Sequence, residues 1–124
     1  MGAFNKLMAY TFAILLSKPF PKWKAFELGL IDEKGKMIKK PVKPEEKKAL
    51  GVFENLIRKI KKLMIKVIPD NRFLTFMITA YLLKSEEKGS KYDEFREELS
   101  GILTDEEEEI LKTTLAQCYR MNLE

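Results

Sequence analysis

The chain has 124 residues, of which 45% are hydrophobic and 34% charged, and this balance predicts one globular domain spanning residues 1–124. It holds no histidine and a single cysteine, Cys118, which excludes a histidine base, histidine metal sites and an intrachain disulfide. The net charge of +4 is split: residues 18–66 carry fifteen Lys or Arg against six Asp or Glu (+9), and residues 67–124 carry seven against thirteen (−6). Such polarity favours contacts between oppositely charged surfaces.

A first helix is predicted over residues 3–17, where apolar residues recur at helical spacing on two sides. A helix that is apolar around most of its circumference is either buried in its own fold or docked on a partner, and both interpretations remain open. Pro19 and Pro21 end the helix. The candidate partner contacts on this possible docking helix (residues 1–17) are Phe4, Leu7, Tyr10 and Phe12.

The longest stretch without charge, residues 7–17, is shorter than the roughly 20 residues of a membrane span. Lys6 precedes this stretch as in a signal peptide, but Ser17-Lys18-Pro19 lacks the usual cleavage pattern. We therefore expect no membrane span and a protein that is made in the cytoplasm.

A two-stranded β-hairpin is predicted over residues 25–39. Phe26, Leu28 and Ile31 mark its first arm and Met37 and Ile38 its second. The turn is Asp32-Glu33-Lys34-Gly35, in which Gly35 is free to adopt a positive φ. A basic extended segment with Pro41 and Pro44 follows, and both prolines disfavour helix before the next element.

The clearest helix is predicted over residues 45–68, where Pro44 suits the first helical turn and Glu45 and Glu46 complement the positive end. One apolar stripe runs along it, and the Lys and Arg residues lie off that stripe. Ile65 is the exception, because at 100° per residue it falls on the basic face. We therefore predict that Ile65 contacts a partner or a neighbouring segment. The stripe comprises Phe53, Leu56, Ile57, Ile60, Leu63, Met64 and Val67.

Three further helices complete a helical core over residues 45–124. Residues 71–86 carry two apolar stripes and are predicted to form the most buried helix. Ser90 caps a short helix that turns Tyr92, Phe95, Leu99 and Ile102 inward, and Thr104 with Glu107 forms a capping box for the last helix. The predicted fold class is mainly α, with four to five helices and one small β-hairpin. The apolar face of the last helix is Ile110, Leu111, Leu115, Cys118 and Tyr119.

Seven cations form a candidate basic surface, provided that the second hairpin arm runs beside helix 45–68. Such a surface attracts DNA phosphates without sequence preference, or an acidic protein face; a solvated helix face is the plainer interpretation. Aromatic residues for stacking on bases are absent among these lysines, which favours a protein partner. The seven residues are Lys39, Lys40, Lys43, Arg58, Lys59, Lys62 and Lys66.

The sequence shows no enzyme motif: a phosphate loop, a dinucleotide glycine pattern and a serine elbow are all missing. The acidic run Asp105–Glu109 fits the first turn of a helix better than a metal site, because consecutive carboxylates point around a helix. Cys118 lies on an apolar face, as a small buried residue does. We expect a non-enzymatic protein without cofactor or metal.

Residues 23–67, with the motif LGLIDEKGK and the helix PEEKKAL…ENLIRKIKKL, resemble small, mostly uncharacterised proteins of tailed bacteriophages. This resemblance covers about a third of the chain and implies a virion-associated or DNA-packaging protein, without catalytic residues. The leading expectation is thus a phage virion structural or assembly protein, which is assembled in the host cytoplasm and contacts other virion proteins or copies of itself. The alternative is a small nucleic-acid-binding or host-regulatory protein that uses the basic face of helix 45–68.

Overall fold

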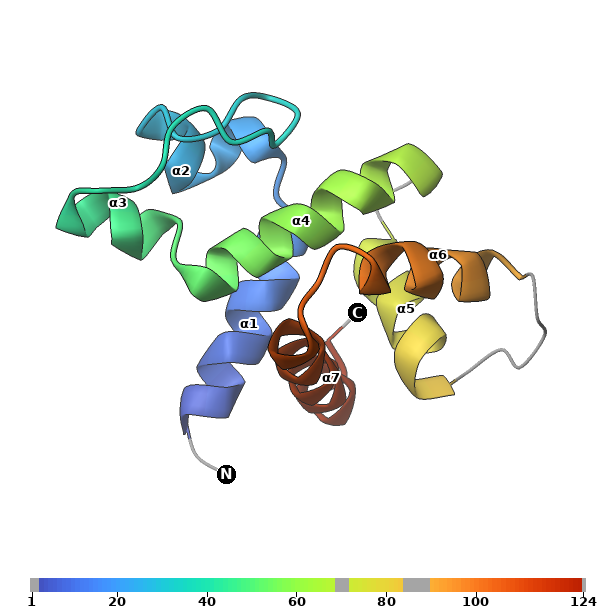
Figure 1. Ribbon diagram of the computed structural model, residues 1–124. Helices are drawn as coiled ribbons and strands as arrows, with labels where there is room; N and C mark the ends of the chain where they lie inside the picture. The colour runs from blue at the N-terminus through green and yellow to red at the C-terminus, as the bar shows by residue number, and fades with distance from the viewer. Residues whose placement is uncertain (1–2, 69–71, 84–89, 124) are drawn as a thin grey trace.

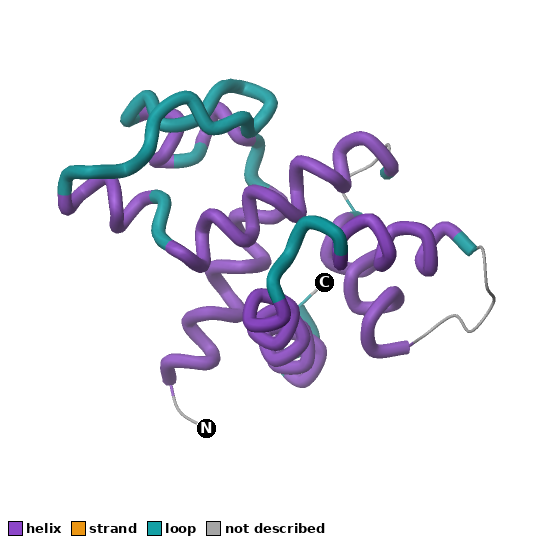
Figure 2. Tube along the Cα trace, in the orientation of Figure 1, coloured by secondary structure: helices purple, strands orange, loops and turns teal. Residues whose placement is uncertain are grey.

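The computed structural model describes residues 3–68, 72–83 and 90–123, and leaves the side chains of Ala3 and Phe4 undescribed (Figure 1). Over these ranges the chain forms seven α-helices, a 3-10 turn at Phe20–Lys22 and a π-helical turn at Thr79–Leu83. The described residues contain no β-strand (Figure 2). The helices are α1 (Ala3–Ser17), α2 (Lys24–Glu27), α3 (Pro44–Ala49), α4 (Val52–Val67), α5 (Phe73–Ile78), α6 (Lys91–Ser100) and α7 (Asp105–Arg120).

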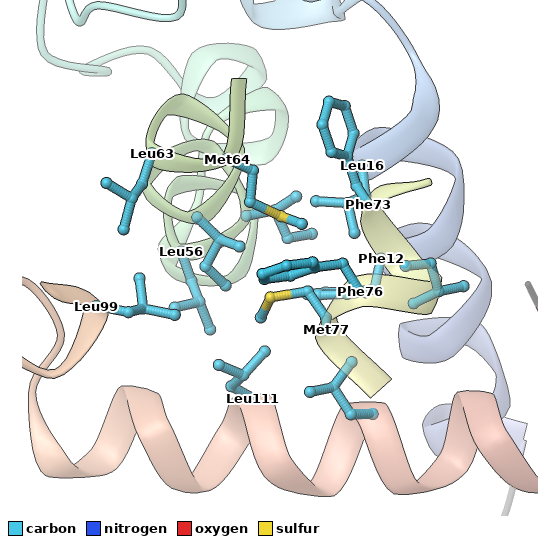
Figure 3. Close-up of a cluster of buried hydrophobic side chains, with 14 of the residues drawn as sticks. Phe12, Leu16, Leu56, Leu63, Met64, Phe73, Phe76, Met77, Leu99 and Leu111 are labelled. Atoms are coloured by element: carbon cyan, nitrogen blue, oxygen red, sulfur yellow. The ribbon is translucent and has the colours of Figure 1, made fainter. Parts of the chain in front are cut away.

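The core lies where α1 packs against α4, α5 and α7. Figure 3 shows Phe12, Phe76 and Met77 meeting at its centre, with Leu99 of α6 and Leu111 of α7 reaching in from the edge. In α5, five of the six residues are buried, in agreement with the prediction that residues 71–86 are the most buried. That predicted helix differs at its ends: α5 begins at Phe73, the π turn follows, and residues 71 and 84–86 lie outside the described residues.

The predicted β-hairpin over residues 25–39 is wrong. Its first arm starts as the helical turn α2, and the only ladder contact among the described residues is one isolated antiparallel bridge between Ile31 and Met37. Leu30 and Ile31 are consecutive and both buried, whereas a strand sends successive side chains to opposite faces. The turn itself forms as predicted, with Gly35 at φ 84° and its N–H bonded to the Asp32 carbonyl.

The single helix predicted over residues 45–68 is interrupted. Leu50 ends α3 with φ −136° and ψ 59°, its side chain is buried, and α4 begins after Gly51. The chain therefore bends so that Leu50 reaches the core. Since α2 also replaces part of the first hairpin arm, the described residues form seven helices and not the expected four to five. The start of α3 agrees with the prediction, since Pro44 occupies its first position.

The two predicted caps in the C-terminal half are confirmed. The Ser90 hydroxyl accepts a hydrogen bond from the Asp93 N–H, and Thr104 and Glu107 form the capping box of α7. Two predicted core residues are misplaced, because Ile102 is 47% exposed and Tyr119 is 51% exposed. Ile102 follows the end of α6, so the helical spacing that placed it inward no longer applies.

Candidate interaction surfaces

The first candidate surface is an exposed apolar row on α1. Leu7, Tyr10 and Ile14 are 62%, 50% and 55% exposed, and their spacing of three and four residues places them within about 60° of one another around the helix. We call these three residues the α1 stripe. Leu7 and Tyr10 were predicted as partner contacts, and Ile14 was not. Isolated apolar residues on a surface are ordinary, whereas a row of three on one helix face marks a candidate docking surface.

The other two predicted contacts on this helix have different outcomes. Phe12 is fully buried and its ring lies 6.5 Å from that of Phe53, centroid to centroid, so its prediction as a surface contact is wrong. The predicted contact at Phe4 lies outside the described residues, because its side chain is not described. The helix thus uses one apolar side for the core and keeps the other exposed, which reconciles the two interpretations of the sequence.

Two grooves border α1. One, of about 410 Å³, lies between α1 and α5, where Tyr10 and Ile14 of the α1 stripe face Phe73 and Leu74. The other, of about 210 Å³, lies between α1 and α7, is lined by Met8 and Ile110 together with polar residues of both helices, and contains none of the three stripe residues. The α1 stripe therefore borders the first groove, a shape that suits the ridges and grooves of another helix.

The seven predicted cations fall into two groups at different places. Lys39, Lys40 and Lys43 belong to the segment that leads into α3, and Figure 1 shows α3 at the left of the view. Helix α4, which carries the other four cations, runs towards the right of the view and ends at Val67. Lys39 is already paired, because its ammonium lies 2.9 Å from the Glu46 carboxylate. Lys40 and Lys43 are exposed.

The second group surrounds a hollow of about 320 Å³, which we call the α4 cleft. It is lined by Arg58, Lys59, Lys62, Leu63, Lys66 and Ile102. Ile65, 42% exposed, lies between Lys62 and Lys66 along the same helix. Its exposure agrees with its predicted place off the core, while its contact with a partner stays a prediction.

Two cations of the α4 cleft have structural roles. Arg58 donates to the Gly35 carbonyl at 2.9 Å and to Asn55 Oδ1 at 2.8 Å, and its burial lowers the pKa of the guanidinium. Lys59 lies 3.1 Å from the Glu107 carboxylate of α7. Among the described residues, Lys62 and Lys66 form no ion pair, so these two carry the free positive charge of the cleft.

Lys61 is buried and only 4% exposed, although the helical pattern of the sequence placed it off the apolar stripe. Its ammonium donates to the backbone carbonyls of Leu15 and Lys18 at the end of α1 and lies 5.2 Å from the centre of the Phe20 ring. Burial lowers the pKa of Lys61 to about 8. The sequence held a signal for this, since Lys61 is four residues after Ile57 and three before Met64, at the edge of the apolar stripe.

The single thiol of the chain lies in the core. Cys118 is buried, its Sγ lies 3.6 Å from the Ala9 carbonyl oxygen, and burial raises the pKa of the thiol to about 11. Over the described residues, no three carboxylates or thiols are grouped as metal ligands. In the same part of the chain, no helix is long and apolar enough to cross a membrane.

Comparison of the chain with protein-family models, with curated proteins and with solved structures found no match. The α1 stripe and the α4 cleft are therefore the two features of the molecule that indicate a function.

Proposed function

We propose that the protein is a non-enzymatic assembly protein that binds a partner protein through the α1 stripe. The observation that carries this proposal is the row of Leu7, Tyr10 and Ile14, each at least half exposed on a helix whose opposite side is in the core. Burying such side chains contributes about 25 cal/mol per Å² of apolar surface removed from water. A partner that covers them gains most of its binding energy from that area.

The spacing of the α1 stripe indicates the kind of partner. Intervals of three and four residues are those of helices that pack along each other, so the partner contributes a helix. Its side chains then enter the groove between α1 and α5, beside Phe73 and Leu74. Lys6 is the one charged residue of α1, so little desolvation of charge opposes such docking.

The proposed place of this assembly is a virion, with the partners among virion proteins. This part rests on the resemblance of residues 23–67 to tailed-bacteriophage proteins, and the comparisons add nothing to it. Mass spectrometry of purified particles from the source that encodes the chain tests it directly. Absence of the chain from the particles would contradict this location without affecting the α1 docking surface.

The docking surface itself is tested with the double variant Tyr10→Ser and Ile14→Ser. We expect this variant to keep its melting temperature, because both side chains are exposed, and to lose co-sedimentation with the particles. The matched control is Ile38→Ser with Val52→Ser, two exposed apolar residues away from α1. Equal co-sedimentation of both variants would show that α1 is not the docking helix.

A second candidate function is nucleic-acid binding through Lys62 and Lys66 in the α4 cleft. Free lysines near phosphates give affinity that falls steeply with salt and shows no sequence preference. The acidic first turn of α7 adjoins this cleft through the Lys59–Glu107 contact and opposes the approach of a polyanion. Titration of labelled duplex DNA at ~150 mM salt decides the matter, and tight binding would promote this candidate above the first.

A further inference from the structure

The outer face of α6 is acidic. Glu94, Glu97 and Glu98 are exposed, and their spacing of three and four residues places them on one side of the helix. The opposite side, with Phe95 and Leu99, is buried in the core. Among the described residues none of these three carboxylates forms an ion pair. We call them the α6 acidic face.

This face matches the free cations of the α4 cleft in spacing. Lys62 and Lys66 are four residues apart, and so are Glu94 and Glu98; four residues correspond to about 6 Å along a helix. Two helices that lie side by side therefore align both lysines with both carboxylates. Ile102, which is 47% exposed, supplies apolar surface next to the lysines.

The two charged surfaces are neighbours on one molecule. Ile102, which lines the α4 cleft, lies two residues beyond the end of α6. Despite this proximity, Lys62 and Lys66 make no ion pair with the carboxylates of their own α6. Both surfaces therefore remain available to a second molecule.

We propose that two copies of this chain pair about a two-fold axis, with the α4 cleft of each copy on the α6 acidic face of the other. A two-fold interface brings the same patch of both copies together, so adjacent opposite charges on one surface are complementary to themselves. Both sets of charges are satisfied in one contact, whereas a uniformly acidic partner or duplex DNA is repelled by α6. This self-association uses a surface other than the α1 stripe and does not depend on the proposed function.

The association is weak and sensitive to salt, because exposed ion pairs are screened. Sedimentation of the full-length chain should show dimer at about 20 mM salt and monomer at about 500 mM salt. The double variant Lys62→Glu with Lys66→Glu should be monomeric, and so should Glu94→Lys with Glu98→Lys. An equimolar mixture of the two variants should restore the dimer, because each cleft then meets an α6 face of opposite charge.

Matched controls change the same charges elsewhere. Lys47→Glu with Lys48→Glu and Glu27→Lys with Glu45→Lys alter exposed residues of α2 and α3, away from both surfaces, and should leave the dimer intact. Circular dichroism confirms that every variant is folded. A double variant of the α1 stripe, Tyr10→Ser with Ile14→Ser, should also dimerise, which separates this inference from the proposed function.

Three results would overturn the inference. The first is a wild-type chain that is monomeric at low salt, and the second is a mixture of folded charge-reversed variants that remains monomeric. The third is tight binding of duplex DNA at ~150 mM salt that Lys62→Glu with Lys66→Glu abolishes, which assigns the cleft to nucleic acid instead. Dimerisation in the mixture but in neither variant alone would establish the pairing.

Discussion

The ammonium of Lys59 lies 3.1 Å from the carboxylate of Glu107, and this contact joins the basic helix α4 to the acidic first turn of α7. Glu107 also accepts a hydrogen bond from the Thr104 N–H at 3.0 Å. Burial opposes the ionisation of Glu107, but the bonds from Thr104 and Lys59 outweigh it and lower the pKa of the carboxyl. The two oppositely charged parts of the sequence thus meet at a partly buried ion pair.

A double-mutant cycle with Lys59→Met and Glu107→Gln should reveal a coupling of about 0.5–1 kcal/mol in the free energy of unfolding, since the pair is partly buried. Chemical denaturation of the four proteins at low salt measures it. The control pair is Lys24 and Glu27, whose side chains are 62% and 71% exposed, and its coupling should be close to zero. Equal coupling in both cycles would mean that burial of the Lys59–Glu107 pair is unimportant.

Glu46 should make the protein sensitive to acid. Its carboxylate accepts hydrogen bonds from the Lys43 and Val42 N–H groups, both at 3.0 Å, and pairs with Lys39. The Lys43 bond first, then Lys39 and Val42, lower the pKa of Glu46 from 4.5 to about 2. Because the folded-state pKa is lowered, this stabilisation is complete above pH 4.5 and is lost as the pH falls towards 2.

The variant Glu46→Gln lacks this titration, so the difference in unfolding free energy between wild type and variant should shrink as the pH falls from 5 to 2. Denaturant titrations at several pH values measure that difference. Glu45→Gln, an exposed neighbour on the same helix turn, is the control and should show little change. A constant difference for Glu46→Gln down to pH 2 would contradict the low pKa.

Lys61 should produce a second rise of stability with pH, at alkaline pH. Burial lowers its pKa from 10.5 to about 8, so the folded chain releases a proton that the unfolded chain still holds. Stability contributed by this group therefore rises between about pH 8 and 10.5. The variant Lys61→Met keeps the apolar stem and lacks the proton, so its unfolding free energy should not show this rise. If the unfolding free energies of wild type and variant change in parallel with pH, the lowered pKa of Lys61 is refuted.

How far the sequence predicted the structure is seen in α4 and α7. Most of the predicted stripe, including Leu56, Ile60 and Met64, is buried as its spacing requires, whereas Val67 at its end is 45% exposed. The Thr104–Glu107 capping box forms as predicted, because both signals are local. The break at Leu50 was not predicted, because burial of that side chain depends on helices that are distant in the sequence. The hairpin prediction was wrong for the same reason, because the core buries both Leu30 and Ile31, although consecutive residues of a strand point to opposite faces.

The candidate surfaces were predicted in part. Leu7 and Tyr10 are exposed, but Phe12 is not, because helical periodicity ranks the two apolar sides of α1 equally and only the positions of α4, α5 and α7 decide which one is covered. Similarly, the sequence shows seven cations, and the structure alone shows that Lys39 and Lys59 are paired with carboxylates.

The final prediction concerns Gly35, where the turn meets the core. Its φ is 84°, a left-handed conformation that costs a residue with a Cβ roughly 1–2 kcal/mol. A Cβ at this position would also lie 2.4 Å from Cζ of Phe20, which is itself buried with its ring centre 5.0 Å from that of Trp23. Overpacking of this kind typically costs a further ~1–3 kcal/mol.

Gly29 offers a matched control, because its φ is 77° and a Cβ there meets no atom within 4 Å. Gly29→Ala should therefore lose only the backbone contribution, and Gly35→Ala should be less stable than Gly29→Ala by about 1–3 kcal/mol, the contribution of the clash. Denaturant unfolding of both variants measures this difference. In a second variant, Gly35→Ala with Phe20→Leu, the smaller side chain at position 20 leaves room for the new Cβ. The two changes together should therefore reduce the unfolding free energy by less than the sum of their separate effects. If the two alanine variants are equally stable, the close approach of Phe20 to the turn does not constrain Gly35.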